Sequence, residues 1–129
     1  MVRKASCCCG KCFIEVEGEP SLNGICHCSN CKRRTGSAFG WSAYFADSQV
    51  RQKSGDLRLH EIHSAQHQQR WFCADCGTTL FWKASALPEH TGIAGGCFTE
   101  TPLPEPMLSA QNSNKCPWVT LPESWQLSG

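Results

Sequence analysis

The sequence predicts a mainly β fold with one short helical turn. Short segments that alternate apolar and polar residues, or that are rich in aromatic residues, recur along the chain, and such runs are typical of strands. Glycine and proline, 11 and 7 in number, separate these segments at short intervals. A helix start signal and a helix stop signal occur together around residues 29–36. These three observations favour short strands over long helices.

The expected strands are short, and most are bounded by a turn signal. Residues 12–17 alternate in polarity and stop at Gly18, whereas the strand expected over 91–98 is weakened by three glycines. Two aromatic segments flank a pair of cysteines and are expected to form a hairpin. In chain order, we expect strands at residues 12–17, 39–46, 57–59, 70–72, 79–82 and 91–98.

The one expected helical turn begins at Ser29 and ends at Gly36. A serine is a favourable N-cap, and a glycine is a favourable residue just past a helix C-terminus. The last thirty residues contain five of the seven prolines, which cannot donate a backbone hydrogen bond. We therefore expect this segment to be mostly extended coil with short strands.

Length and charge restrict the class of protein. The chain has 129 residues, a length typical of one domain that buries its own core, so we expect a single domain over residues 1–129. Twelve basic and eleven acidic residues give a net charge of +1, which does not favour a nucleic-acid or membrane-surface binder. No apolar run approaches the ~20 residues of a membrane span. Residues 1–6 lack the apolar stretch of a secretory signal. We expect a soluble, cytoplasmic protein.

Eleven cysteines are the most informative feature of the composition. An odd number cannot pair completely within one chain, and a reducing cytosol favours metal binding or thiol chemistry over disulfides. Most of these cysteines form three clusters, in residues 7–12, 26–31 and 73–77.

The first and third clusters together predict a closed four-cysteine zinc site. Cys73 and Cys76 are separated by two residues and followed by glycine, a spacing that aims two thiolates at one ion, while a closed tetrahedral site needs four ligands. Cys9 and Cys12 have a spacing suited to supply the other two. However, Cys12 shares the apolar face of its strand and is expected to be buried. We therefore assign Cys7 and Cys9 to the site.

The middle cluster contains Cys26, Cys28 and Cys31 without a fourth cysteine beside them. A zinc ion with three protein ligands keeps an open position for water or substrate, which is typical of a reactive site. One alternative is a second structural zinc completed by His27 or by a distant residue, although His27 is expected to point away from the ion. The other alternative is that no metal binds here.

The three motifs resemble those of the glutathione-dependent formaldehyde-activating (GFA) family. The resemblance rests on CxCG in residues 7–10, CHCxxCKRxxGS in residues 26–37 and FCxxCGT in residues 72–78. It implies a β-tent of small antiparallel sheets around a structural zinc. It also implies two zinc ions per chain: one held by Cys7, Cys9, Cys73 and Cys76, and a catalytic one held by Cys26, Cys28 and Cys31. The chain departs from the family pattern in its extra thiols, Cys8, Cys97 and Cys116.

The family resemblance implies a carbon–sulfur lyase that joins formaldehyde to glutathione and gives S-(hydroxymethyl)glutathione. A free thiol is mostly protonated at neutral pH, and an open zinc position can hold a substrate thiol deprotonated. Three thiolates leave such a centre negative, and Lys32, Arg33 and Arg34 are the candidate cations beside it. The alternatives are a non-catalytic zinc-binding interaction module and a thiol-based redox or metal-handling protein.

Other residues are expected to be structural. A polar stretch containing His60, His63 and His67 is interpreted as a surface loop. The five tryptophans are assigned to the core, whereas Phe39 and Tyr44 follow the middle cluster and can either line a pocket or pack in the core.

Overall fold

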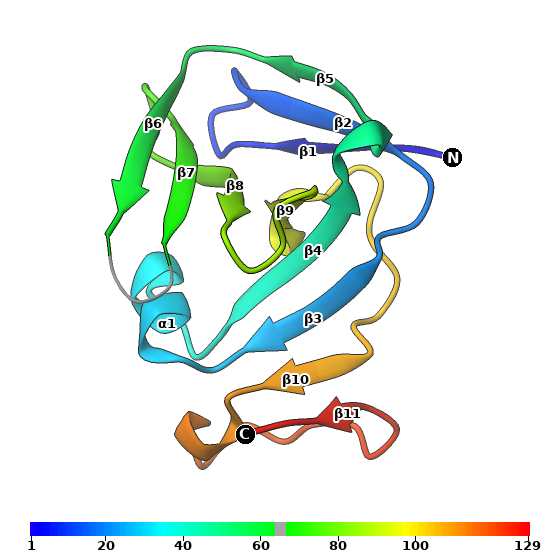
Figure 1. The fold of residues 1–129 in the computed structure, drawn as a ribbon, viewed down its shortest axis with the longest axis vertical. Coiled ribbons are helices and arrows are strands. Elements are labelled where there is room, and N and C mark those ends of the chain that lie inside the picture. Colours follow the sequence, from blue (N-terminus) through cyan, green and yellow to red (C-terminus); the bar gives the residue numbers. More distant parts are fainter. Residues whose placement is uncertain (64–66) are drawn as a thin grey trace.

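The computed structural model describes residues 1–63 and 67–129. The prediction of a mainly β fold is confirmed, because these residues form eleven strands and a single α-helix (Figure 1). The strands make two sheets. The smaller sheet has the order β1-β2-β5 and antiparallel pairing. Its strands are β1 (Val2–Ser6), β2 (Phe13–Glu17) and β5 (Val50–Ser54).

The larger sheet has eight strands in the order β11-β10-β3-β4-β9-β8-β7-β6. Its pairings are antiparallel, except that β10 runs parallel to both β3 and β11. Figure 1 shows β10, from the C-terminal part of the chain, beside β3, and β11 on the other side of β10. The strands are β3 (Leu22–Cys26), β4 (Gly40–Ala46), β6 (Leu57–Ile62), β7 (Gln68–Cys73), β8 (Thr79–Ala84), β9 (His90–Ala94), β10 (Leu108–Ala110) and β11 (Gln126–Leu127).

Each of the six expected strand segments contains an observed strand. Three observed strands in the N-terminal half, β1, β3 and β5, were not expected. Of these, β3 contains Asn23 and Gly24, which are poor strand formers. Tertiary contacts compensate for the buried Asn23 amide, which donates to Pro104 O at 2.9 Å and accepts from Trp41 Nε1 at 2.7 Å. The other two, β1 and β5, carry few apolar residues and pair with the predicted strand β2 on either side. Tertiary pairing therefore overrides weak local preference in all three.

The single α-helix, α1 (Ser29–Thr35), connects β3 to β4. It ends at Gly36 as expected, with φ 64° in the left-handed region that glycine adopts readily. Its N-cap is Cys28 rather than Ser29, because the Cys28 sulfur accepts a hydrogen bond from the backbone N–H of Cys31 at 3.3 Å. A cysteine of the middle cluster thus also caps the helix. No helix within the described residues has the length and apolar character needed to cross a membrane.

The hydrophobic core contains side chains from both sheets. Alternate residues of β4, such as Ala43 and Phe45, are fully buried on the core-facing side. Tyr44 lies between them in sequence, so it projects from the opposite face of β4. Trp118 is 74% exposed, so its assignment to the core was wrong. The core cluster comprises Ala5, Cys7, Cys12, Ile14, Val16, Ala43, Phe45, Cys73, Leu80, Phe81, Ile93, Phe98 and Leu103.

Candidate metal centres

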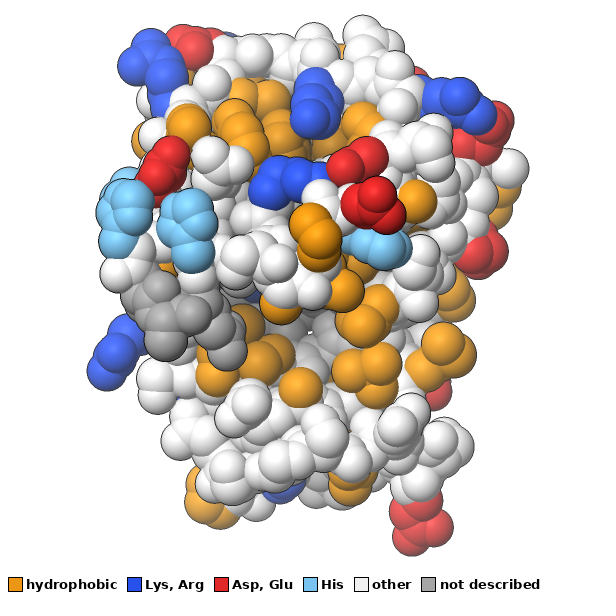
Figure 2. Space-filling view, in the orientation of Figure 1, with side chains coloured by type: hydrophobic (Ala, Val, Ile, Leu, Met, Phe, Trp, Pro, Cys, Tyr) orange, Lys and Arg blue, Asp and Glu red, His pale blue; other side chains and the backbone are white. Residues whose placement is uncertain are grey.

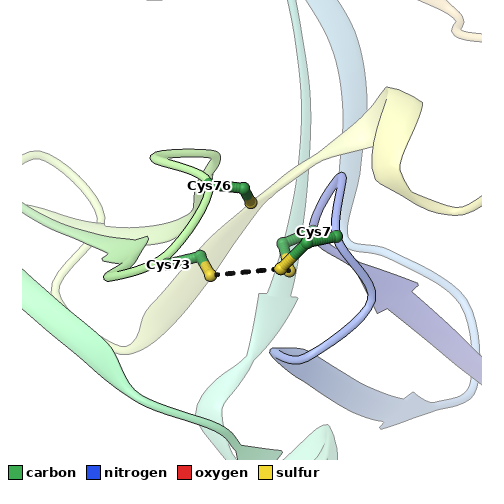
Figure 3. Close-up of side chains that lie close together, drawn as sticks. Cys7, Cys73 and Cys76 are labelled. Carbon is green, nitrogen blue, oxygen red and sulfur yellow. Dashed lines mark hydrogen bonds between the residues drawn. The ribbon is translucent and has the colours of Figure 1, made fainter.

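Two loops far apart in sequence bring four cysteine sulfurs together. Cys7 and Cys9 lie after β1, whereas Cys73 ends β7 and Cys76 follows it in the turn to β8. All four sulfurs lie within 4.8 Å of one another, and Figure 3 shows the side chains of Cys7, Cys73 and Cys76 directed toward one another. The Cys7–Cys9 and Cys9–Cys73 sulfur distances are 3.6 and 3.7 Å. A tetrahedron with Zn–S bonds of ~2.3 Å has edges of about 3.8 Å, so the donor set fits zinc.

The two loops have the same local construction. Gly10 donates its N–H to Cys7 O at 3.0 Å, and Gly77 donates its N–H to Cys73 O at 2.9 Å. Both glycines have a positive φ, 80° and 79°, which other residues rarely adopt. Each turn thereby directs two sulfurs of its own loop toward the other loop.

Hydrogen bonds between the loops support this juxtaposition. The backbone N–H of Cys8 donates to Thr78 Oγ1 at 3.0 Å, and Lys11 Nζ lies 3.0 Å from Asp75 Oδ2. The Cys8 side chain is exposed and outside the group of four. These polar contacts hold the first and third clusters in register.

Cys12 is fully buried, as strand parity predicts. Its thiol lies 3.6 Å from Asp56 O, and its backbone N–H donates to the Cys7 sulfur at 3.3 Å. Burial raises the pKa of the Cys12 thiol to about 12. Cys12 therefore stays protonated, and it contacts the group of four through its hydrogen bond to Cys7. The ligand role of the four cysteines remains a prediction.

The middle cluster forms a second, three-sulfur group. Cys26 ends β3, Cys28 caps α1 and Cys31 lies in its first turn, and their sulfurs lie within 4.8 Å of one another. Among residues 1–63 and 67–129, no fourth Cys, His, Asp or Glu ligand atom joins them. We call these three residues the three-cysteine cluster.

His27 does not complete the three-cysteine cluster. Its ring is fully buried, with Nε2 at 2.9 Å from Ser109 Oγ on β10, and it packs edge-on against Phe39. The side chain thus points away from the three sulfurs, as expected from its position between two candidate ligands. This arrangement leaves one side of the cluster without a protein ligand in the described part of the chain.

Hydrogen bonding between Cys26 and Cys31 changes the pKa of both thiols. Hydrogen bonding from the Cys31 thiol lowers the pKa of Cys26 to about 6, and the same contact raises the pKa of Cys31. A thiolate at Cys26 is therefore favoured near neutral pH. Thiolate sulfurs are the ligands that zinc prefers, so the cluster fits a zinc ion chemically as well as in spacing.

Arg34 is the candidate cation that approaches the three-cysteine cluster. Its guanidinium carbon lies 4.4 Å from the centre of the Trp82 ring, and its buried Nη2 has no hydrogen-bond partner among the described residues. Gly40 makes room for it, since a Cβ atom there would lie 2.7 Å from Nη2 and 3.1 Å from Cys31 Cβ. Burial lowers the pKa of Arg34, and the nearby sulfurs oppose this effect.

The other two candidate cations do not occupy this position. Lys32 Nζ donates to Asn114 O at 2.6 Å, and Arg33 is exposed. Sequence reasoning did not identify Arg70, which is 8% exposed on β7 and whose Nε donates to Gln68 Oε1 at 3.0 Å. The signal in the sequence was an arginine next to two aromatic residues in an expected strand. Charged side chains in such strands are rarely buried without a partner.

A cavity of about 220 Å³ opens over the three-cysteine cluster. The hydroxyl-bearing side chains of Ser42 and Tyr44 and the amide of Gln68 line it together with apolar residues. Tyr44 and Gln68 also line an adjoining cavity of about 230 Å³. Tyr44 therefore lines a pocket rather than packing in the core, while Phe39 lines a larger cavity of about 500 Å³ between α1 and the Cys76 turn.

His60, His63 and His67 are exposed, but the interpretation of their stretch as a loop was wrong for His60, which lies in a strand; residues 64–66 of the stretch lie outside the described residues. His60 belongs to β6, whereas His63 follows β6 and His67 precedes β7. The Nε2 atoms of His63 and His67 lie 3.5 and 3.7 Å from Glu61 Oε2. The three side chains of Glu61, His63 and His67 are exposed. Figure 2 shows Lys, Arg, Asp and Glu side chains scattered over this face of the molecule, without a continuous basic stripe.

Comparison with known proteins places the chain in a family. Its residues 2–113 match the model of the glutathione-dependent formaldehyde-activating enzyme family. The chain belongs to the GFA family. A structurally similar protein is a Rhodobacter sphaeroides protein solved by crystallography in a structural genomics programme, with a TM-score of 0.60 and 28% sequence identity. The match covers 74% of this chain and 87% of the other. In this GFA protein, both cysteine groups fall within the residues that match the family.

Proposed function

We propose that this GFA protein is a zinc-dependent carbon–sulfur lyase that adds a small aldehyde to a thiol such as glutathione and also cleaves the adduct. The observation that supports this most directly is the three-cysteine cluster, which has three converging sulfurs, no fourth ligand in the described residues and a cavity above it. A purely structural zinc site is closed by four ligands. Three sulfur donors beside a cavity favour an enzyme over a non-catalytic interaction module.

The two candidate zinc sites have different proposed roles. Cys7, Cys9, Cys73 and Cys76 hold a structural ion that joins the loops after β1 and β7. Cys26, Cys28 and Cys31 hold the ion of the active site. When bound there, zinc supplies the Lewis acidity that keeps a substrate thiol deprotonated.

The chain's own residues bind and orient the substrates in this proposal. The reaction forms one S–C bond, breaks the S–H bond of the thiol and transfers that proton to the former carbonyl oxygen, so the adduct is the sum of thiol and aldehyde. Arg34 offsets the negative charge of the sulfurs. The apolar wall of the cavity, which includes Leu22 and Leu108, excludes water from the reacting carbon.

Exchange NMR tests this function. Glutathione and ¹³C-formaldehyde form their adduct spontaneously, so the measured quantity is the exchange rate between free and adduct formaldehyde with and without protein. We expect the zinc-loaded protein to accelerate exchange in proportion to its concentration, and the Cys28→Ser variant to give the spontaneous rate. Equal rates for wild type and buffer would contradict the proposed activity.

A further inference from the structure

Three strands of the large sheet place one tyrosine and one tryptophan on the same face. The register pairs Tyr44 of β4 with Gly92 of β9, and Gly92 with Trp82 of β8. Directly paired residues point to the same side of a sheet. Because β9 lies between the other two strands, Tyr44 and Trp82 can meet only across the position of Gly92.

Gly92 makes that contact possible because it has no side chain. A Cβ atom at this position would lie 2.2 Å from Trp82 Nε1, which is far inside van der Waals contact. The indole lies over Gly92, and its N–H donates to the Tyr44 hydroxyl oxygen at 3.0 Å. The two rings meet edge to face, with centroids 6.5 Å apart and planes at 80°.

Because the Tyr44 oxygen is the acceptor in this contact, the Tyr44 hydroxyl proton points away from the indole N–H. A phenol oxygen that accepts from Trp82 still has its own O–H to donate. Among residues 1–63 and 67–129, Trp82 is the hydrogen-bond partner of the Tyr44 hydroxyl, and Tyr44 is the acceptor in that bond. Tyr44 lines the same cavity as the three cysteines. Burial raises the pKa of Tyr44, so the hydroxyl remains a donor at neutral pH.

The Trp82 indole also packs against Arg34. Arg34 stacks on the Trp82 ring at 4.4 Å, and Trp82 is 2% exposed. Stacking of a guanidinium on an indole is favourable, and more so when both are shielded from water. Trp82, which donates to Tyr44, is therefore restrained by contacts with both Gly92 and Arg34.

We propose that the Tyr44 hydroxyl and the three-cysteine cluster together form a binding site for the oxygen of an aldehyde or of its thiol adduct. This inference rests on the proposed function. As the S–C bond forms, the carbonyl π electrons move to oxygen, and Tyr44 donates its hydrogen bond to that oxygen. The proton released by the substrate thiol balances the proton that the oxygen gains. Tyr44 is then a catalytic residue, and Trp82 is a positioning residue.

The chain's single tyrosine allows a test that does not depend on turnover. Protein labelled with ¹³C at the tyrosine ζ carbon gives one resonance, which reports on Tyr44 alone. The zinc-loaded protein is titrated with two unreactive thioethers, S-ethylglutathione and S-(2-hydroxyethyl)glutathione, which differ by one hydroxyl group. We expect only the hydroxyl-bearing thioether to shift the resonance and to bind at least fivefold more tightly. Equal shifts and equal affinities would overturn the oxygen site.

Variants separate a catalytic hydroxyl from a structural ring. For Tyr44→Phe we expect formaldehyde exchange to fall by about 10²-fold, with zinc content unchanged, glutathione affinity within twofold of wild type and no preference between the thioethers. Trp82→Phe should shift the Tyr44 resonance and lower exchange less, whereas Trp71→Phe, a matched change on the opposite face of the sheet, should do neither. A Tyr44→Phe protein with the wild-type exchange rate, or with the preference retained, would overturn the proposal.

The proposed function can fail separately. If wild-type protein does not accelerate exchange, the lyase activity is contradicted. The thioether pair then decides the oxygen site by itself: a shift confined to the hydroxyl-bearing ligand supports it, and no such difference rules it out.

Discussion

The sulfurs of Cys9 and Cys73 lie 3.7 Å apart although 64 positions separate the two residues in the chain. Cys73 is buried in the main core cluster, whereas Cys9 is exposed. An ion bound between them would close a long loop and join the turn after β1 to the end of β7. Because such a site does not exist in the unfolded chain, its metal-binding energy contributes to folding.

Loss of one ligand of the four-cysteine group, which comprises Cys7, Cys9, Cys73 and Cys76, should unfold the protein. Structural zinc binding contributes on the order of 10 kcal/mol, which rivals the ~5–15 kcal/mol stability of a whole domain. We expect Cys73→Ser to be insoluble or largely unfolded by circular dichroism. Cys8→Ser is the matched control, since Cys8 is exposed and outside the group. A folded Cys73→Ser protein with normal thermal stability would show that these four residues do not hold a structural ion.

Loss of a ligand in the three-cysteine cluster should spare the fold. These ligands lie within six residues, so an ion here restrains only a short loop. Serine is also a good N-cap, so Cys28→Ser should keep α1. We expect this variant to fold, retain one zinc and lose glutathione binding, as measured by circular dichroism, elemental analysis and calorimetry. If it unfolds as completely as Cys73→Ser, the cluster is structural.

Chelation should remove the two ions in sequence. A site with three protein ligands and an open position is accessible to a chelator, whereas the four-cysteine group has Cys7 and Cys73 buried. We expect increasing chelator to release one zinc with no change in circular dichroism and the second zinc together with unfolding. Release of both ions in one step with loss of structure would contradict this separation.

Arg34 should strengthen zinc binding at the three-cysteine cluster through its charge. Arg34→Gln removes a cation close to three sulfurs, and interactions of this kind are worth on the order of 1 kcal/mol or more at a partly buried site. We expect zinc affinity there to fall by about tenfold in competition with a chromophoric chelator. The neighbouring Arg33 is exposed, so Arg33→Gln should stay within twofold of wild type. Equal effects of the two changes would assign the result to overall charge.

A side chain at position 92 should destabilise the protein. A Cβ atom would collide with the Trp82 indole at 2.2 Å, and overpacking of this kind typically costs 1–3 kcal/mol. We expect Gly92→Ala to lower the free energy of unfolding by about that amount and to displace the Tyr44 resonance in the labelled protein. At Gly96 a Cβ atom would meet nothing within 4 Å, so Gly96→Ala is the control. An unchanged Tyr44 resonance in Gly92→Ala would contradict the contact across β9.

Features that depend on local spacing could be predicted from the sequence. The alternation of β2 shows which residues point inward, and this parity separates the buried Cys12 from the grouped Cys7 and Cys9. The helix stop at Gly36 is likewise a local property. Such features need no knowledge of the tertiary fold.

Features that depend on strand order could not be predicted. The contact between Tyr44 and Trp82 requires that β9 lie between β4 and β8 with Gly92 in register with both. Similarly, Arg34 rather than Lys32 approaches the sulfurs because Gly40 leaves space for it. Sequence alone identifies the three cations but does not rank them.

The central claim is that the three-cysteine cluster holds a second zinc to which a thiol binds, and native mass spectrometry tests it most directly. Wild-type protein, Cys28→Ser and Cys8→Ser are each measured with and without glutathione. We predict two zincs per chain and a bound glutathione for wild type and Cys8→Ser, but one zinc and no glutathione for Cys28→Ser. One zinc in all three proteins, or glutathione retained by Cys28→Ser, would contradict the account.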